Sequence, residues 1–220
     1  MNNLINFIYK KASNLVSPPF CEGCKSFLKE RLILCKNCFD KISPIVSFNL
    51  LVTPKYSVKV FAISDYQEPL KSLILAKMWS NRLASQQLGE LIWQMTNLKN
   101  HEFDYLIPIP LHWTRFLRRG FNQTEVVATI LSSKSSKPVA NILKRNKYTK
   151  FQSSLDVYKR NENVKNAFKI ELKKNIYEGR NLLLVDDLLT SGATIINAAK
   201  ELIKLKPATI SVVVACRVIK

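Results

Sequence analysis

Two adjacent carboxylates, Asp186 and Asp187, follow an apolar run and precede a loop of hydroxyl and small side chains. The loop, residues 190–194, reads Thr-Ser-Gly-Ala-Thr. Adjacent carboxylates accept hydrogen bonds from vicinal hydroxyl groups, whereas hydroxyl side chains and a glycine let the backbone approach an anion closely. The chemistry that suits this stretch is binding of a ligand with a diol and a phosphate, and ribose 5-phosphate has that layout.

The elements on either side position these groups. The unbroken apolar run 182–185 predicts a strand buried on both faces of a parallel sheet, and the helical spacing of apolar residues over 195–203 predicts a helix after the loop. The carboxylates then lie at the carboxyl end of a strand, where open α/β sheets bind ligands. The loop meets a helix N-terminus, which favours a phosphate. The alternative is a buried strand and a capped helix without a ligand.

Residues 181–194 closely resemble the phosphoribosyl pyrophosphate (PRPP) signature of type I phosphoribosyltransferases. That signature is an apolar strand, two acids, two variable residues and then Thr-Thr-Gly-x-Thr. Ser191 stands where the second threonine is usual, and this change keeps the hydroxyl group.

A second anion-binding turn is predicted where the strand 105–109 gives way to a helix. Arg118, Arg119 and Gly120 crowd this point. A pyrophosphate needs such a turn opposite the first phosphate loop. The alternative is a solvated basic turn.

Two Cys-x-x-Cys pairs, Cys21 with Cys24 and Cys35 with Cys38, are separated by ten residues. Each pair can present two thiolates to one tetrahedral ion, and four thiolates favour Zn²⁺. The spacing predicts a minimal zinc-ribbon-like module whose folding depends on a structural zinc ion. The alternatives are two disulfides or a redox Cys-x-x-Cys motif.

The chain has 34 Lys and Arg residues against 16 Asp and Glu residues, a formal net charge of +18. Residues 134–174 hold twelve of the basic residues and three of the acidic ones, with aromatic residues among them. Basic and aromatic side chains together suit single-stranded nucleic acid. The predicted contacts are Lys144, Arg145, Lys147 and Lys150. The alternatives are a solvated loop with core aromatics, and a lysine bias without a partner.

No stretch reaches the roughly 20 apolar residues that cross a bilayer, and the N-terminus does not read as a signal peptide. We therefore expect a cytoplasmic location. Residues 1–17 have the spacing of an amphipathic helix, expected to dock on the rest of the chain, with membrane-surface contact as the alternative. The expected division is this helix, the zinc module at 18–45, a proline-containing linker at 46–57 and a second domain at 58–220.

The order of these motifs resembles the ComF family, also called ComFC or GntX-like, of bacterial proteins linked to natural transformation. Five motifs carry the resemblance: the four cysteines, Pro-Ile-Pro-Leu-His at 108–112, Arg-Gly-Phe-Asn-Gln at 119–123, Arg-Asn-Glu-Asn at 160–163 and the paired-acid signature. The resemblance implies an α/β fold of the type I phosphoribosyltransferase class, a mainly parallel twisted sheet with flanking helices.

The resemblance also implies residue roles. Asp186 and Asp187 would hold the ribose hydroxyl groups and form the catalytic pair, and Mg²⁺ would arrive with PRPP. The implied PRPP-binding residues are Asp186, Asp187, Leu188, Leu189, Thr190, Ser191, Gly192, Ala193 and Thr194, with Arg119 and Gly120 for pyrophosphate.

Three functions remain open at this point. The chain could bind PRPP and single-stranded DNA and work with the DNA-uptake and recombination machinery. It could be a metabolic phosphoribosyltransferase with an unknown acceptor, or a PRPP-sensing regulator without catalysis. All three need both anion turns, and only the second requires turnover.

Overall fold

The structure, a computed structural model, describes residues 19–30, 32–45, 47–78, 82–111, 116–117, 120–145, 167–171 and 175–218. The expected helix at 1–17, the Arg-Asn-Glu-Asn motif at 160–163 and four predicted site residues, Arg118, Arg119, Lys147 and Lys150, lie outside these residues.

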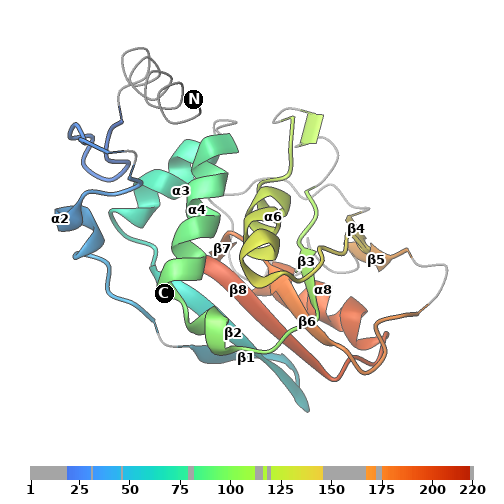
Figure 1. Cartoon of the computed structure of the whole chain (residues 1–220). Coiled ribbons are helices and arrows are strands. Elements are labelled where there is room, and N and C mark those ends of the chain that lie inside the picture. Colours follow the sequence, from blue (N-terminus) through green and yellow to red (C-terminus); the bar gives the residue numbers. More distant parts are fainter. Residues whose placement is uncertain are drawn as a thin grey trace.

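The secondary structure follows the predicted alternation of strands and helices (Figure 1). The strands are β1 (Phe48–Thr53), β2 (Tyr56–Asp65), β3 (Tyr105–Pro108), β4 (Leu143–Arg145), β5 (Phe168–Ile170), β6 (Asn181–Val185), β7 (Leu188–Leu189) and β8 (Thr209–Arg217). The helices are α2 (Lys36–Phe39), α3 (Leu70–Met78), α4 (Arg82–Met95), the 3-10 helix η1 (Asn97–Asn100), α6 (Gln123–Ser135) and α8 (Ala193–Ile203).

The main sheet has six strands in the order β1-β2-β8-β6-β3, with β7 pairing with the end of β8. β2, β8, β6 and β3 run parallel, and β1 is antiparallel to β2 at one edge. This confirms the predicted mainly parallel sheet. β4 and β5 form a separate antiparallel hairpin beyond the β3 edge (Figure 1).

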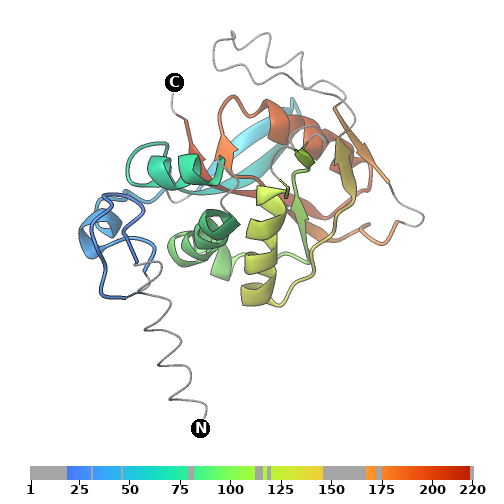
Figure 2. The same cartoon turned by 90° about the horizontal axis from the view of Figure 1, so that it is seen from above.

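The sheet is covered on both faces, which explains the unbroken apolar sequences of its central strands (Figure 2). Leu183 and Val185 of β6 pack in a cluster with residues of α3, α4 and α6. Leu182 and Leu184, which point to the other face, pack in a second cluster with α8. Both sides of β6 are therefore core, as expected for a central parallel strand.

The predicted linker at 46–57 is wrong, because β1 and the start of β2 occupy it. β1 is an edge strand on which only alternate side chains reach the core, and Leu51 is 62% exposed. One solvated face gives a mixed polar and apolar sequence, and Pro54 lies in the two-residue turn to β2 rather than in a linker. The proline and the mixed polarity therefore mark a hairpin.

The cysteine module shares its core with the larger domain. Cys21, Leu28, Leu34 and Cys38 belong to the same buried cluster as α3 and α4. A Cβ added at Gly23 would lie 2.6 Å from the Cβ of Pro69, so the first cysteine turn touches the larger domain closely.

β7 and η1 were not predicted. Cys216 is fully buried in β8. Among the described residues, no helix combines the length and apolar character needed to cross a bilayer.

The α4–α6 contact generates a stability prediction at Gly89. A Cβ at this position would lie 2.9 Å from the Cβ of Ile130 in α6. Gly89→Ala should lower the free energy of unfolding by about 1 kcal/mol, because overpacking outweighs the gain in helix propensity. Thermal unfolding measures the effect.

The compensating variant is Gly89→Ala with Ile130→Gly, because Ile130→Gly removes the Cβ that the new methyl group would meet. Gly89→Ala should therefore no longer destabilise the chain when it is compared with Ile130→Gly alone. If Gly89→Ala raised the melting temperature in the otherwise unchanged chain, the close packing of α4 on α6 would be contradicted.

Candidate functional site

The paired carboxylates lie at the carboxyl end of β6, as predicted. The Asp186 amide donates to the carbonyl oxygen of Val213 in β8 at 3.0 Å, which continues the sheet pairing for one residue beyond β6. The Asp187 amide donates to Oδ1 of Asp186 at 2.8 Å. Asp186 is buried and Asp187 is half-buried, so the second carboxylate is the more accessible.

After the carboxylates the chain forms β7 and then a short loop into α8. Leu189 is buried in the core, whereas Thr190 is exposed and Ser191 and Thr194 are half-buried. The two leucines of the PRPP-binding prediction thus hold the loop to the sheet through β7. The hydroxyl side chains remain accessible at the helix start.

Gly192 caps the N-terminus of α8 with a positive φ of 75°. Its carbonyl oxygen accepts from the Ile196 amide at 2.8 Å, and this is the first turn of the helix. The cap residue has no side chain, so no side-chain oxygen of its own competes for the first N–H groups of α8. Those groups and the positive end of the helix dipole suit a phosphate.

Strand β1 also touches the phosphate loop. A Cβ on Gly192 would lie 3.2 Å from Cδ1 of Leu50 and 3.4 Å from its Cδ2. Position 192 therefore favours glycine twice, through its φ angle and through this contact.

Of the second predicted anion turn, the structure describes Gly120, whereas Arg118 and Arg119 lie outside the described residues. β3 pairs with β6 in parallel, with Pro108 opposite Val185, and the Ile109 amide donates to the Val185 carbonyl oxygen at 2.9 Å. Gly120 has a φ of 77°, and its amide donates to the carbonyl oxygen of Phe116 at 2.7 Å. Parallel pairing thus brings Pro108 and Ile109, at the end of β3, beside Val185, which directly precedes the paired carboxylates.

The sequence analysis missed Tyr66, which follows β2 at this same edge. Burial raises the pKa of its phenol, and electrostatic interactions with Cys216, Glu68 and Asp187 raise it further. Next to it, Nε of Arg217 donates to Oδ1 of Asp65 at 2.7 Å, which ties the ends of β8 and β2 together. Only the strand order could reveal Tyr66, because 120 residues of chain separate it from Asp186.

Of the predicted nucleic-acid contacts, the structure describes Lys144 and Arg145, both in β4. Lys144 is exposed and lies directly opposite Lys169 of β5. Arg145 places its guanidinium 5.4 Å from the ring centre of Phe168, which is buried. The lysine pair therefore forms the outer face of the hairpin, and the buried Phe168 marks its inner face.

The four cysteines of the predicted metal module converge. Their sulfur atoms all lie within 4.8 Å of one another, and Cys24 Sγ is 3.7 Å from Cys35 Sγ. A tetrahedral ion with metal–sulfur bonds of about 2.3 Å needs sulfur atoms about 3.8 Å apart. The cluster can therefore hold a metal ion, and all four cysteines are unbridged rather than in the alternative disulfides.

The thiols of the cluster differ in acidity. A hydrogen bond with the Ser26 hydroxyl, at 3.0 Å, lowers the pKa of Cys24 to about 6, and the Ser26 backbone adds to this effect. Burial raises the pKa of Cys38 to about 12, and hydrogen bonds with the other cysteines raise it too. Burial also raises the pKa of Cys21, but backbone hydrogen bonds outweigh it and leave that pKa below its ordinary value.

Comparison with known proteins agrees with this geometry. Residues 80–220 match the family model of the phosphoribosyl transferase domain. The match contains β3, the paired carboxylates and the phosphate loop, but not β1, β2 or the cysteine module.

Relatives match over more of the chain. "Competence protein F" of Haemophilus influenzae is 32% identical over 194 residues, which cover 85% of this chain and 80% of the relative. "DNA utilization protein YhgH" of Salmonella typhimurium is 27% identical over 210 residues, 90% of this chain and 89% of the relative. "Competence protein ComFC" of Bacillus subtilis is 36% identical over 107 residues, 48% of this chain and 41% of that protein.

The acidity difference predicts an order of alkylation in chelator-treated protein. At pH 7 Cys24 should react first with limiting iodoacetamide and Cys38 last, because the thiolate is the nucleophile. Cys24 gains its proton as the pH falls through about 6, so its rate should fall about tenfold between pH 7 and pH 5. Peptide mass spectrometry measures the rates.

Ser26→Ala is the matched control. It removes the hydroxyl group that forms a hydrogen bond with Cys24 Sγ, so it should reduce the rate of Cys24 alkylation at pH 7. Equal rates at all four cysteines would contradict the described cluster.

Proposed function

Because the chain belongs to the ComF family of phosphoribosyltransferase-fold proteins, we propose that it binds PRPP at the edge formed by β6, β3 and α8. We propose further that it binds single-stranded DNA and acts in DNA uptake on the cytoplasmic side of the membrane. The names of its relatives, a competence protein and a DNA utilization protein, support this role.

The observation that carries the PRPP proposal is the meeting of three groups at one sheet edge. Asp186 and Asp187 end β6, Gly192 caps α8, and the segment that leads to Gly120 continues from β3. A diol, a 5′-phosphate and a pyrophosphate need three such groups. This arrangement supports the proposal, because open α/β sheets bind ligands where the carboxyl ends of neighbouring parallel strands lie together.

Each part of PRPP then has a partner of suitable chemistry. The two carboxylates accept hydrogen bonds from the ribose hydroxyl groups, and the start of α8 with Thr190, Ser191 and Thr194 donates to the 5′-phosphate. The turn at Arg119 and Gly120 would receive the pyrophosphate. Mg²⁺ bound with PRPP would neutralise the pyrophosphate charge, because water molecules and phosphate oxygens supply most of the ligands of this ion.

If transfer takes place, pyrophosphate leaves C1 of the ribose with the bonding electron pair, and an acceptor donates a new pair to C1. The protein positions the sugar and stabilises the charge that develops, so this chemistry needs no nucleophilic Ser, Cys or His. A chain with two histidines is suited to such a site. We infer that Tyr66, which follows β2 at this edge of the sheet, limits the space for an acceptor.

We propose zinc as the metal of the cysteine cluster. Four sulfur ligands in a closed set suit Zn²⁺, and a structural ion of this kind stabilises the fold around it. The cluster shares its core with α3 and α4, so the stability provided by the ion extends to the larger domain.

The PRPP proposal predicts the effect of neutralising both carboxylates. Asp186→Asn with Asp187→Asn should weaken PRPP binding at least about 100-fold, because two charge-assisted hydrogen-bond acceptors are lost. Calorimetric titration with PRPP and Mg²⁺ measures the affinity, and a pyrophosphate-release assay with free bases or DNA tests for turnover.

The matched control is Asp40→Asn with Glu178→Gln, which removes two charges away from this edge and should leave the affinity unchanged. Unchanged affinity in the Asp186 and Asp187 variant, with its fold intact, would exclude this edge as the PRPP site.

The zinc proposal predicts about one zinc ion per chain in protein purified without added metal. Cys21→Ser with Cys38→Ser should lose the ion and also lower the melting temperature of the whole chain, since both sulfur atoms lie in the shared core. Elemental analysis and thermal unfolding measure the two effects. Protein that is purified without any metal in the cysteine cluster would refute the proposal.

A further inference from the structure

A cleft of about 540 Å³ lies between the end of β3, the start of α6 and the β4–β5 hairpin. Its volume is that of a typical small-molecule or nucleotide site. The cleft adjoins the predicted pyrophosphate turn, because Phe116, which lines it, accepts a hydrogen bond from the Gly120 amide.

One wall of the cleft is apolar and includes an exposed aromatic ring. Phe116 is 46% exposed, and Leu143 and Pro108 line the cleft with it. An exposed phenylalanine beside a cleft is a stacking surface for a planar ring.

Polar residues also line the cleft, among them two carboxylates, Glu125 and Glu171, and two cations, Lys144 and Arg145. Oε1 of Glu125, in the first turn of α6, accepts a hydrogen bond from Nδ2 of Asn141 at 2.9 Å. A carboxylate in this position accepts hydrogen bonds from an exocyclic amino group such as that of cytosine or adenine. The Glu125 charge also disfavours a phosphate deep in the cleft, so an anionic ligand would place its charge at the rim.

The rim supplies positive charge. Lys144 lines the cleft and faces Lys169 directly across the hairpin, and both side chains are exposed. Like charges directly opposite one another destabilise a strand pair. Within the described part of the chain no ion pair involves either lysine. An anionic chain along this rim would relieve the repulsion.

We propose that this cleft receives a base of single-stranded nucleic acid, stacked on Phe116, with its amino edge toward Glu125 and its backbone along Lys144 and Lys169. This inference rests on the proposed single-strand binding and gives it a place and a mode. It also gives a preference, because thymine presents a carbonyl oxygen where cytosine and adenine present an amino group.

The test measures the affinity of the full chain for fluorescently labelled dC, dA and dT oligonucleotides by anisotropy over a range of salt concentrations. Wild-type protein should bind dC and dA about fivefold or more tightly than dT. Phe116→Ala should weaken binding of dC about tenfold. Glu125→Leu should bring the dC and dT affinities together.

Removing the rim charges tests the backbone contact separately. Lys144→Gln with Lys169→Gln should reduce the slope of log affinity against log salt by about 1.4, the value for two phosphates of a single strand. Ultraviolet cross-linking of an oligonucleotide that contains 5-iodocytosine, followed by peptide mass spectrometry, should label the peptide that contains Phe116. This second measurement uses the unaltered protein and does not depend on the folding of a variant.

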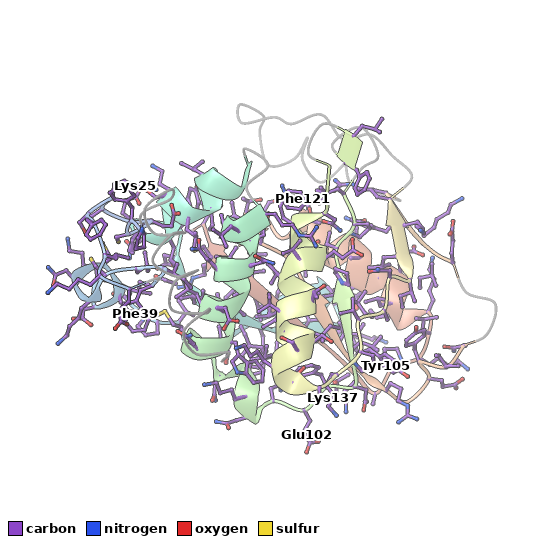
Figure 3. All side chains as sticks on the ribbon, turned by 45° about the horizontal axis from the view of Figure 1, so that its top comes forward. Lys25, Phe39, Glu102, Tyr105, Phe121 and Lys137 are labelled. Carbon is purple, nitrogen blue, oxygen red and sulfur yellow. The ribbon has the colours of Figure 1, made fainter. Side chains whose placement is uncertain are left out.

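The matched aromatic control is Phe27→Ala, because Phe27 is 64% exposed on the cysteine module. That module, marked by Lys25 and Phe39 in Figure 3, lies on the opposite side of the molecule from the hairpin. The control should bind dC as wild type does.

The outcomes separate the two proposals. If wild-type protein binds no oligonucleotide, the proposed single-strand function fails and this inference fails with it. If wild-type protein binds but Phe116→Ala binds equally well and the cross-link maps elsewhere, the cleft assignment is overturned and the function stands. If polyglutamate displaced dC from wild-type protein and from Phe116→Ala equally well, the surface would be one for an acidic protein. That result would also overturn the assignment.

Discussion

The structure depends on one constraint, the position of β6 between two parallel strands with a buried face on each side. Every side chain from 182 to 185 is fully buried, and the strand pairs with β8 on one edge and β3 on the other. The backbone N–H and C=O groups of β6 are paired with β8 and β3, and leaving such buried groups unpaired would cost free energy. The first place where the chain can turn toward solvent is therefore at Asp186 and Asp187. The same parallel arrangement fixes where β3 and α8 present their ends, so one strand sets the geometry of the whole ligand edge.

The cysteine module is part of the same construction rather than an appendage. Its buried residues lie in one cluster with α3, α4 and the sheet face beneath them, and Gly23 is in close contact with Pro69. A minimal module with little core of its own gains apolar contacts in this way, and it covers one side of α3 and α4 in return. Metal occupancy and the integrity of the larger domain are therefore coupled through ordinary side-chain packing.

Sequence alone predicted the features whose signals are local. The apolar run, the paired acids and the hydroxyl loop follow one another within 14 residues, and the four cysteines need only their spacing. The features it missed depend on partners that are distant in the chain. β1 was not predicted because an edge strand with one solvated face has a mixed sequence, and Tyr66 because only the order β2-β8-β6 brings it to the edge of the sheet that holds Asp187. The cleft beside Phe116 likewise draws on segments that meet only in three dimensions.

The contact between Leu50 and Gly192 has a consequence for exchanging parts between homologous proteins. The matched phosphoribosyl transferase region begins at residue 80, so it includes the glycine but not the strand whose leucine lies against it. A chimaera that received residues 80–220 from another member of the family would combine a foreign phosphate loop with the original β1. In that chimaera the phosphate loop and β1 would come from different proteins, so their side chains would not be matched to each other. The smallest unit that can be exchanged intact therefore begins before β1, and the boundary drawn from sequence similarity crosses the interior of a packed structure.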